Sequence, residues 1–213
     1  EYRVGMCHHD IGICLCQLGN ITRAERHFRR AIRIWESLGN ANDLANTLNS
    51  LGVSLCSVGR YDEALKHFQD CLDVALRVGA TRRAAYAQSG IADVLLARRQ
   101  YEQAAQFYQE SSDRADQAGI EALLVYNLAK LGESLYGQGE LGEALTLASR
   151  ARQMAAELGL VFERGVACAL QARILARQGA HADSYPLFRE AAECFARSDV
   201  LEQAKVHLWW GHS

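Results

Sequence analysis

Alanine recurs at intervals of 40 residues along this chain of 213 residues, at Ala24, Ala64, Ala104 and Ala144. Other positions keep the same interval. Leucine stands at Leu15, Leu55, Leu95, Leu135 and Leu175, and a large side chain stands at Phe28, Phe68, Tyr108 and Phe188, with Ala148 as the smaller exception. Such a period is typical of stacked arrays, in which each unit buries its apolar face against its neighbours. The chain is therefore expected to consist of similar units added in a row.

One unit, residues 42–79, has the pattern of a helical hairpin. Leucines follow one another at steps of three and four residues between Leu44 and Leu55, which is the apolar stripe of an amphipathic helix. The stripe breaks at Gly59, and a second one runs through Phe68 to Gly79. Glycine permits the left-handed backbone conformation with which helices commonly end. No segment has the pattern of a strand, so the fold is predicted to be all-α.

The small and large positions of this unit resemble those of the tetratricopeptide repeat (TPR). They are Gly52, Leu55, Tyr61, Ala64, Phe68 and Cys71. The resemblance implies an α-solenoid, a right-handed superhelix of about five and a half helical hairpins. The expected units are residues 2–40, 41–80, 81–120, 121–160 and 161–200, with a partial unit at 201–213, all in a single array over residues 1–213.

Two departures from the family pattern narrow the resemblance. The period is 40 residues instead of the usual ~34, and glycine replaces the proline that closes a typical unit. Such long units are similar to the sensor arrays of MalT-like bacterial regulators, and also to those of kinesin light chains and some G-protein-signalling adaptors. The chain opens at Glu1 inside an expected helix and closes within a sixth unit, so we expect it to be a fragment of a longer protein.

In arrays of this type, the resemblance implies that the first helix of every hairpin lines a concave groove. The side chains of these first helices that lie off the apolar stripe are therefore the candidate binding residues. They are Asn42, Asn46, Asn49, Arg82, Tyr86, Ser89, Asp93, Tyr126, Glu133, Tyr136, Arg173 and Arg177. The three asparagines are spaced four and three residues apart on one helix face, and a carboxamide can both donate to and accept from a peptide backbone. Solvated helix positions are the alternative interpretation.

Several patterns that resemble chemical motifs are better explained by the repeat. Residues 137–142 match the dinucleotide-binding motif in letters, but they follow a helix where the motif requires a preceding strand. Cys7, His8 and His9 point about 100° apart on a helix, so they cannot converge on one metal ion. The arginines between Arg23 and Arg33 form a basic stripe that we interpret as a solvated face or a contact to a preceding unit. No catalytic, cofactor or metal site is predicted.

Composition limits the partners. The formal net charge of −2 argues against direct nucleic-acid binding, and no apolar run reaches the length of a membrane span. The seven cysteines lie within helical patterns, which favours reduced thiols and a cytoplasmic location. The apolar pair Trp209 and Trp210 in the last helix makes self-association through exposed terminal helices an open alternative.

The sequence therefore predicts a binding module without catalytic activity. The expected ligand is a protein or peptide segment, or a small effector, in the groove of the array. By resemblance, the expected role is the sensor or interaction region of a bacterial transcriptional or signalling regulator. The alternatives are a general adaptor scaffold and a regulatory array fused to an enzyme domain.

Overall fold

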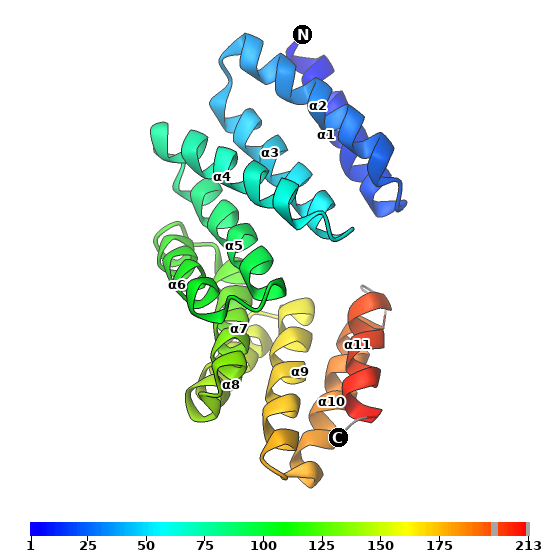
Figure 1. Cartoon of the computed structure of the whole chain (residues 1–213), viewed down its shortest axis with the longest axis vertical. Coiled ribbons are helices and arrows are strands. Elements are labelled where there is room, and N and C mark those ends of the chain that lie inside the picture. Colours follow the sequence, from blue (N-terminus) through cyan, green and yellow to red (C-terminus); the bar gives the residue numbers. More distant parts are fainter. Residues whose placement is uncertain (197–199, 212–213) are drawn as a thin grey trace. The chain divides into compact units, whose positions relative to one another are not determined.

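The structure, a computed structural model, describes residues 1–196 and 200–211 and contains only helices and turns there (Figure 1). The helices are α1 (Tyr2–Gln17), α2 (Ile21–Leu38), α3 (Ala41–Cys56), α4 (Tyr61–Arg77), α5 (Thr81–Ala97), α6 (Tyr101–Gln117), α7 (Glu121–Gln138), α8 (Leu141–Glu157), α9 (Val161–Arg177), α10 (His181–Phe195) and α11 (Val200–Gly211). The prediction of an all-α fold is confirmed.

The chain divides into two compact units, Glu1–Arg98 with α1 to α5 and Arg99–Ser213 with α6 to α11. Within each unit, consecutive helices pack against each other as antiparallel neighbours (Figure 1). The odd-numbered helices, which we call the first helices, also contact one another, α1 with α3, α3 with α5, and α7 with α9. Each unit is therefore a stack in which the even-numbered second helices pack between successive first helices.

The recurring alanines occupy equivalent buried positions. Ala24, Ala64, Ala104 and Ala144 are all 0% exposed, as are Phe28, Tyr108 and Phe188. The Phe68 ring shows why the neighbouring positions must be small. It lies against Gly52 of α3 and Gly90 of α5, where an added Cβ would approach the ring to 2.7 Å and 2.4 Å. One phenylalanine thus joins a hairpin to the first helix of the next one, and close packing leaves no room for a larger residue.

Glycines end the helices as the sequence predicts. Gly39, Gly79, Gly119 and Gly159 have positive φ values between hairpins, and Gly19, Gly59, Gly139 and Gly179 have them within hairpins. Gly39 ends α2 with φ 65°, and its N–H donates to the Glu36 carbonyl while the next N–H donates to that of Trp35. This pattern satisfies carbonyls at the helix end. Arg99 stands at the corresponding turn between α5 and α6 with φ 59°, and it is the only non-glycine residue with a positive φ in the described ranges.

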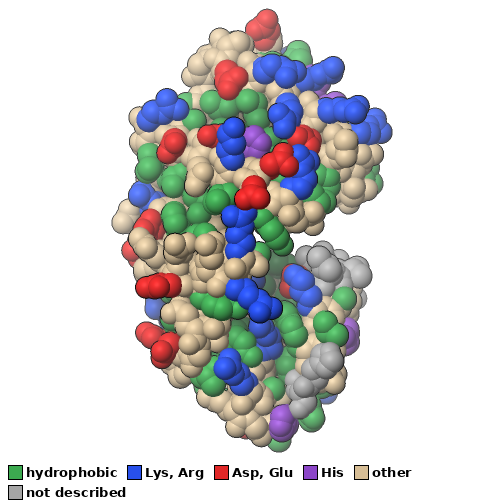
Figure 2. Space-filling model, viewed as in Figure 1, with side chains coloured by type: hydrophobic (Ala, Val, Ile, Leu, Met, Phe, Trp, Pro, Cys, Tyr) green, Lys and Arg blue, Asp and Glu red, His purple; other side chains and the backbone are tan. Residues whose placement is uncertain are grey.

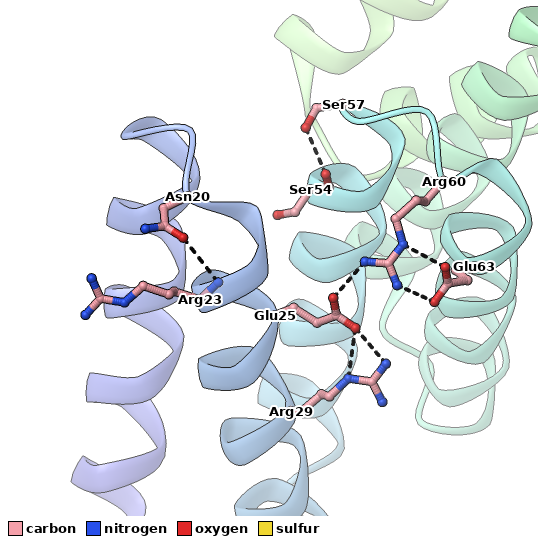
Figure 3. Close-up of polar contacts among 8 residues, drawn as sticks. All are labelled: Asn20, Arg23, Glu25, Arg29, Ser54, Ser57, Arg60 and Glu63. Carbon is pink, nitrogen blue, oxygen red and sulfur yellow. Dashed lines mark hydrogen bonds and ion pairs between the residues drawn. The ribbon is translucent and has the colours of Figure 1, made fainter.

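Arginines at the turns within hairpins connect neighbouring hairpins of the first unit (Figure 3). Arg60, which precedes α4, donates to Glu25 of α2 at 2.8 Å and to Glu63 of its own hairpin at 2.7 Å. Arg98 repeats the contact one hairpin later and lies 2.6 Å from Asp62. Glu25 is largely buried, but its partner Arg60 is more than one-third exposed, and so are Glu63 and Asp62. Water therefore screens these ion pairs, and they contribute little to stability.

The cysteines fall into three groups by exposure, with Cys16 and Cys56 half-buried between the other two. Cys71, Cys168 and Cys194 are buried in the stack, which agrees with a packing role, and no disulfide joins any of the seven cysteines. Cys7 and Cys14, in contrast, are exposed on α1, so the helical pattern around them does not bury them. In the described part of the chain, no helix has a stretch long and apolar enough to span a bilayer.

Candidate functional site

In the first unit, Asn46 lies at the centre of a polar network that joins three first helices. Arg83 of α5 donates from Nη1 to Asn46 Oδ1 at 2.7 Å. On the other side, Asn46 Nδ2 lies 3.4 Å from His9 Nε2 of α1. The three side chains belong to consecutive hairpins, so their positions are fixed by the stacking of the array.

The contacts of the His9 ring fit its neutral form. Burial is the largest influence on the ring and lowers its pKa, which favours the neutral form at pH 7. Nδ1 lies 3.0 Å from Thr47 Oγ1, and this hydroxyl donates to the Asp43 carbonyl and also accepts from Trp35 Nε1. The arrangement is consistent when Nδ1 carries the proton and Nε2 accepts from Asn46.

Asn49 differs from Asn46 because part of its carboxamide is unsatisfied. Its side chain is half-buried, and Oδ1 is a buried acceptor without a hydrogen-bond partner in the described structure. An unpaired buried acceptor costs about 1–3 kcal/mol. Such a group requires an explanation, and one is that the half-buried side chain turns outward to meet a donor of a ligand, since Oδ1 is shielded from solvent in the free chain.

The remaining candidate residues of this unit differ in how far they are exposed to solvent. Asn42 and Arg82 are exposed, whereas Tyr86 and Asp93 are half-buried. Ser89 is 4% exposed, so it lies inside the stack and not on a binding surface. The sequence prediction missed Arg83, the residue that contacts Asn46, because adjacent helix positions point about 100° apart and only coordinates fix the angle.

In the second unit, Glu133 of α7 accepts hydrogen bonds from two cations. Arg173 of α9 donates from Nη1 at 2.6 Å, and Lys130 of α7 donates from Nζ at 2.9 Å. Burial alone would raise the pKa of Glu133, but the two cations outweigh it and lower the pKa to about 2. Glu133 is therefore a carboxylate throughout the physiological range, and it holds Arg173 in one orientation.

Aromatic rings surround these cations. The Arg173 guanidinium carbon lies 4.9 Å from the centre of the Tyr136 ring and 4.4 Å from that of Trp209 in α11. The Arg177 guanidinium lies 5.1 Å from the Tyr136 ring centre, which is within the range of cation–π contacts. Arg173 thus connects three consecutive first helices.

The structure brings together all five candidates of the second unit. Tyr126 joins the others through Lys130, whose Nζ lies 5.8 Å from its ring centre. In Figure 2, Lys and Arg side chains gather over the part of the surface formed by α7 and α9. The sequence prediction missed Lys130, and it singled out Trp209 only as an apolar side chain of the last helix and not as a candidate binding residue. Opposite charges 40 residues apart, at Glu133 and Arg173, were the signal for the contact between hairpins.

The comparison with known families agrees with this architecture. The family model described as "Tetratricopeptide repeat" matches residues 6–73 and 43–117, which together cover more than half of the chain. The chain belongs to the tetratricopeptide repeat family. None of the curated proteins matches the sequence.

Solved structures of other proteins share the fold at low sequence identity. A Rap protein complexed with competence and sporulation factor is 16% identical with a TM-score of 0.81, and it matches over 94% of this chain and 57% of its own. Aspartyl phosphate phosphatase F from Bacillus subtilis is 15% identical with a TM-score of 0.78 over 96% of this chain and 55% of its own. The chain therefore spans little more than half the length of these two proteins.

A third similar structure is a Signal Transduction ATPase with Numerous Domains from Pyrococcus horikoshii, which has a tetratricopeptide repeat sensor. It is 16% identical with a TM-score of 0.72 and matches over 99% of this chain and 37% of its own. At these identities the likeness shows the TPR fold alone.

The chemistry that this TPR array offers is that of hydrogen bonding, charge and aromatic contact. Within the described residues, no group of three or more His, Cys, Asp or Glu side chains is placed to hold a metal ion. The first helices instead present carboxamides and guanidinium groups whose positions are fixed by contacts between hairpins. TPR arrays typically act as scaffolds for protein interaction.

Proposed function

We propose that the chain is a non-catalytic binding module that holds a protein or peptide segment against the exposed faces of its first helices. The observation that supports this best is the unpaired acceptor Oδ1 of Asn49. It lies on the same helix as Asn46, one turn further along. Because Oδ1 itself is shielded from solvent in the free chain, the half-buried side chain would turn outward to accept from a peptide backbone N–H. A small effector with an N–H or O–H group is the alternative ligand.

The regulatory role is part of the same proposal. One of the similar structures is a Rap protein in complex with competence and sporulation factor. Another is a signal-transduction ATPase with a tetratricopeptide repeat sensor. We propose a comparable role for this chain, as the cytoplasmic sensor or interaction region of a bacterial transcriptional or signalling regulator. A general adaptor scaffold and a regulatory array fused to an enzyme domain are the alternatives.

The role of Asn49 is tested with peptides selected by the protein itself. A library of random 12-residue peptides displayed on phage is selected against the purified chain, and the recovered peptides are synthesised with a fluorophore. Binding is measured by fluorescence anisotropy for the wild type, for Asn49→Ala and for the control Arg26→Ala, which changes an exposed position on the second helix α2. Thermal unfolding of each variant is followed by circular dichroism.

We expect Asn49→Ala to weaken peptide binding about tenfold, as the loss of one buried hydrogen bond implies. The same variant should be at least as stable as the wild type, because it removes an unsatisfied polar group. Arg26→Ala should change neither property. Unchanged affinity in Asn49→Ala, or an equal loss in Arg26→Ala, would contradict the proposed binding face.

Self-association is a second proposal and rests on α1. Val4 and Ile11 are 52% and 41% exposed there, whereas the residues 40 and 80 positions after Ile11, Leu51 and Ile91, are 0% and 3% exposed. The apolar face of α1 is thus exposed among the described residues, at positions that neighbouring helices bury elsewhere in the first unit. We propose that a second copy of the chain covers it, and a preceding hairpin of a longer protein is the alternative. We expect Ile11→Glu to shift the sedimentation of the chain towards the monomer. A monomer in the wild type at high concentration would refute this.

A further inference from the structure

We propose that a pocket between α1 and α2 binds the phosphate group of a small phosphorylated molecule. The pocket has a volume of about 440 Å³, and small-molecule sites typically have volumes of about 300–1,000 Å³. Its lining includes Glu1, Val4, His8, Arg30, Arg33 and Ile34. The inference does not rest on the proposed function, because the arginines of this pocket belong to a second helix.

A pocket of the same kind recurs one hairpin later, with a volume of about 420 Å³. Three lining positions of the two pockets correspond to each other 40 residues apart. They are Glu1 and Ala41, Val4 and Leu44, and Ile34 and Val74. Trp35 of the first hairpin also lines the second pocket, so the pocket persists where one hairpin stacks on another. The pocket is thus a feature of the repeat, and the residues that line it decide its chemistry.

The first hairpin departs from the repeat at three of the positions that line its pocket. Arg30 and Arg33 stand where most later hairpins carry acids. The residues at these positions are Asp70 and Asp73, Glu110 and Asp113, Arg150 and Gln153, and Glu190 and Glu193. His8 stands where the second and fourth hairpins bury Leu48 and Leu128, each 6% exposed. Packing does not require these three changes, since the other hairpins stack without them, whereas an anionic ligand explains them together.

The two arginines are available to bind an anion. Arg30 and Arg33 are exposed, and neither forms a hydrogen bond or an ion pair within the described structure. They lie three residues apart on α2, and side chains at this spacing are neighbours on one helix face. Figure 2 shows Lys and Arg side chains gathered over the part of the surface formed by α1 and α2. Since a guanidinium binds phosphate oxygens with two parallel hydrogen bonds, the pair matches the charge of one phosphate dianion.

His8 supplies a third donor to the pocket. Its Nδ1 lies 3.0 Å from His27 Nδ1, so one of the two rings donates to the other. When His27 donates, neutral His8 carries its proton on Nε2, which can then donate to a bound anion. Burial is the main cause that lowers the pKa of His8, and the charges of His27 and Arg30 lower it further. The imidazole therefore lies close enough to Arg30 for both groups to act on one anion.

A phosphate monoester suits this pocket better than other anions do. It carries a charge of about −1.5 to −2 at pH 7 and has three acceptor oxygens, enough for two guanidinium groups and an imidazole. Val4 and Ile34 offer apolar contacts to carbon atoms of the ligand, and the Glu1 carboxylate can accept from a hydroxyl group. A nucleic acid suits it less, because proteins that bind DNA make on the order of 6–10 phosphate contacts.

The test uses glucose 6-phosphate, inorganic phosphate, gluconate and glucose as probes. Binding is measured by titration calorimetry on dilute protein that sedimentation shows to be monomeric, because Val4 also belongs to the exposed face of α1. Arg33→Gln removes one guanidinium, and His8→Leu introduces the residue that the second hairpin has at this position. Arg26→Gln is the control, at an exposed position of α2 that does not line the pocket. Thermal unfolding of each variant is followed by circular dichroism.

We expect glucose 6-phosphate to bind about tenfold tighter than gluconate and glucose, because only a dianion pairs with both guanidinium groups. Arg33→Gln and His8→Leu should each weaken glucose 6-phosphate about tenfold without lowering Tm. Arg26→Gln should change neither binding nor Tm. Inorganic phosphate that binds as tightly as glucose 6-phosphate would support the site with the free ion as its ligand, and weaker binding would support it with the ester.

Absence of binding by both phosphate compounds, or equal affinity for glucose 6-phosphate and gluconate, would overturn the inference. Unchanged binding in Arg33→Gln would overturn it too, and so would an equal loss in Arg26→Gln, which would assign the effect to the general charge of α2. Tighter binding of a twelve-nucleotide oligothymidylate than of glucose 6-phosphate would show a nucleic-acid site instead. The proposed function has its own readout, because library-selected peptides that depend on Asn49 would still bind after each of these failures.

Discussion

Replacing Arg99 with glycine should stabilise the protein. Arg99 ends the turn between α5 and α6 with φ 59°, a left-handed conformation that the corresponding turns reach with glycine. Its side chain is exposed, so no burial compensates for the backbone conformation. The substitution removes the clash between Cβ and the following carbonyl that makes this region unfavourable for other residues.

The size of the effect follows from two opposing contributions. A non-glycine residue in the left-handed region costs roughly 1–2 kcal/mol. Glycine makes the unfolded chain more flexible, which costs about 0.4–1 kcal/mol in return. The expected net gain is about 0.5–1 kcal/mol, and for a chain of this size 1 kcal/mol raises Tm by roughly 2–4 °C.

Two matched variants separate the effect of the backbone conformation from the effect of losing the arginine side chain. Arg99→Ala removes the side chain but keeps the strained φ, so its unfolding free energy in urea should equal that of the wild type. Gly59→Ala introduces a Cβ at φ 76° with no atom within 4 Å, so it should lose about 1 kcal/mol through the backbone alone. The reasoning fails if Arg99→Gly is no more stable than Arg99→Ala.

Three further predictions concern packing, acid and thiols. Gly90→Ala should lose about 1–3 kcal/mol in urea unfolding, since the new Cβ meets the Phe68 ring at 2.4 Å; wild-type stability would contradict this. Because the pKa of Glu133 falls from 4.5 unfolded to about 2 folded, its contribution to stability is complete above pH 4.5 and is lost as the pH falls through 2. In Glu133→Gln, the unfolding free energy should therefore fall less between pH 4.5 and pH 2 than it does in the wild type. The same dependence on pH in both proteins would refute this prediction. Cys7 is exposed, whereas Cys71 is buried and its burial raises the pKa of its thiol to about 12. A thiol reagent should therefore label Cys7 first and Cys71 only after unfolding, as mass spectrometry would show. Labelling of both at the same rate in the folded protein would contradict this.

The repeat made most of the fold predictable from the sequence. A residue that must fit a helix crossing is restricted in size, so the small residue at Gly52 and the large one at Phe68 are visible as a pattern. A helix end in the left-handed conformation is equally predictable where the residue is glycine. The positive φ of Arg99 was not predicted, because arginine rarely adopts this conformation. The burial of Ser89 could not be read from the pattern, because a small polar residue suits a crowded helix contact and a surface equally.

The candidate site was predictable only in part. Tyr136, Arg173 and Glu133 were found because they lie off the apolar stripe, but the contacts among them depend on distances between hairpins. The sequence analysis named Arg82 as a candidate, whereas the neighbouring Arg83 is the residue that contacts Asn46. A difference of one residue turns a helical side chain by about 100°, and the sequence pattern does not fix this angle that closely. The unpaired oxygen of Asn49 is a property of packing that no sequence pattern carries.

The claim that ligands bind the first helices is tested most directly by hydrogen–deuterium exchange with a library-selected peptide. The account predicts that the added peptide slows exchange in α3, α7 or α9 and leaves the exposed sides of α2, α4 and α8 unchanged. Protection confined to those second helices, with α3, α7 and α9 exchanging as in the free protein, would contradict it.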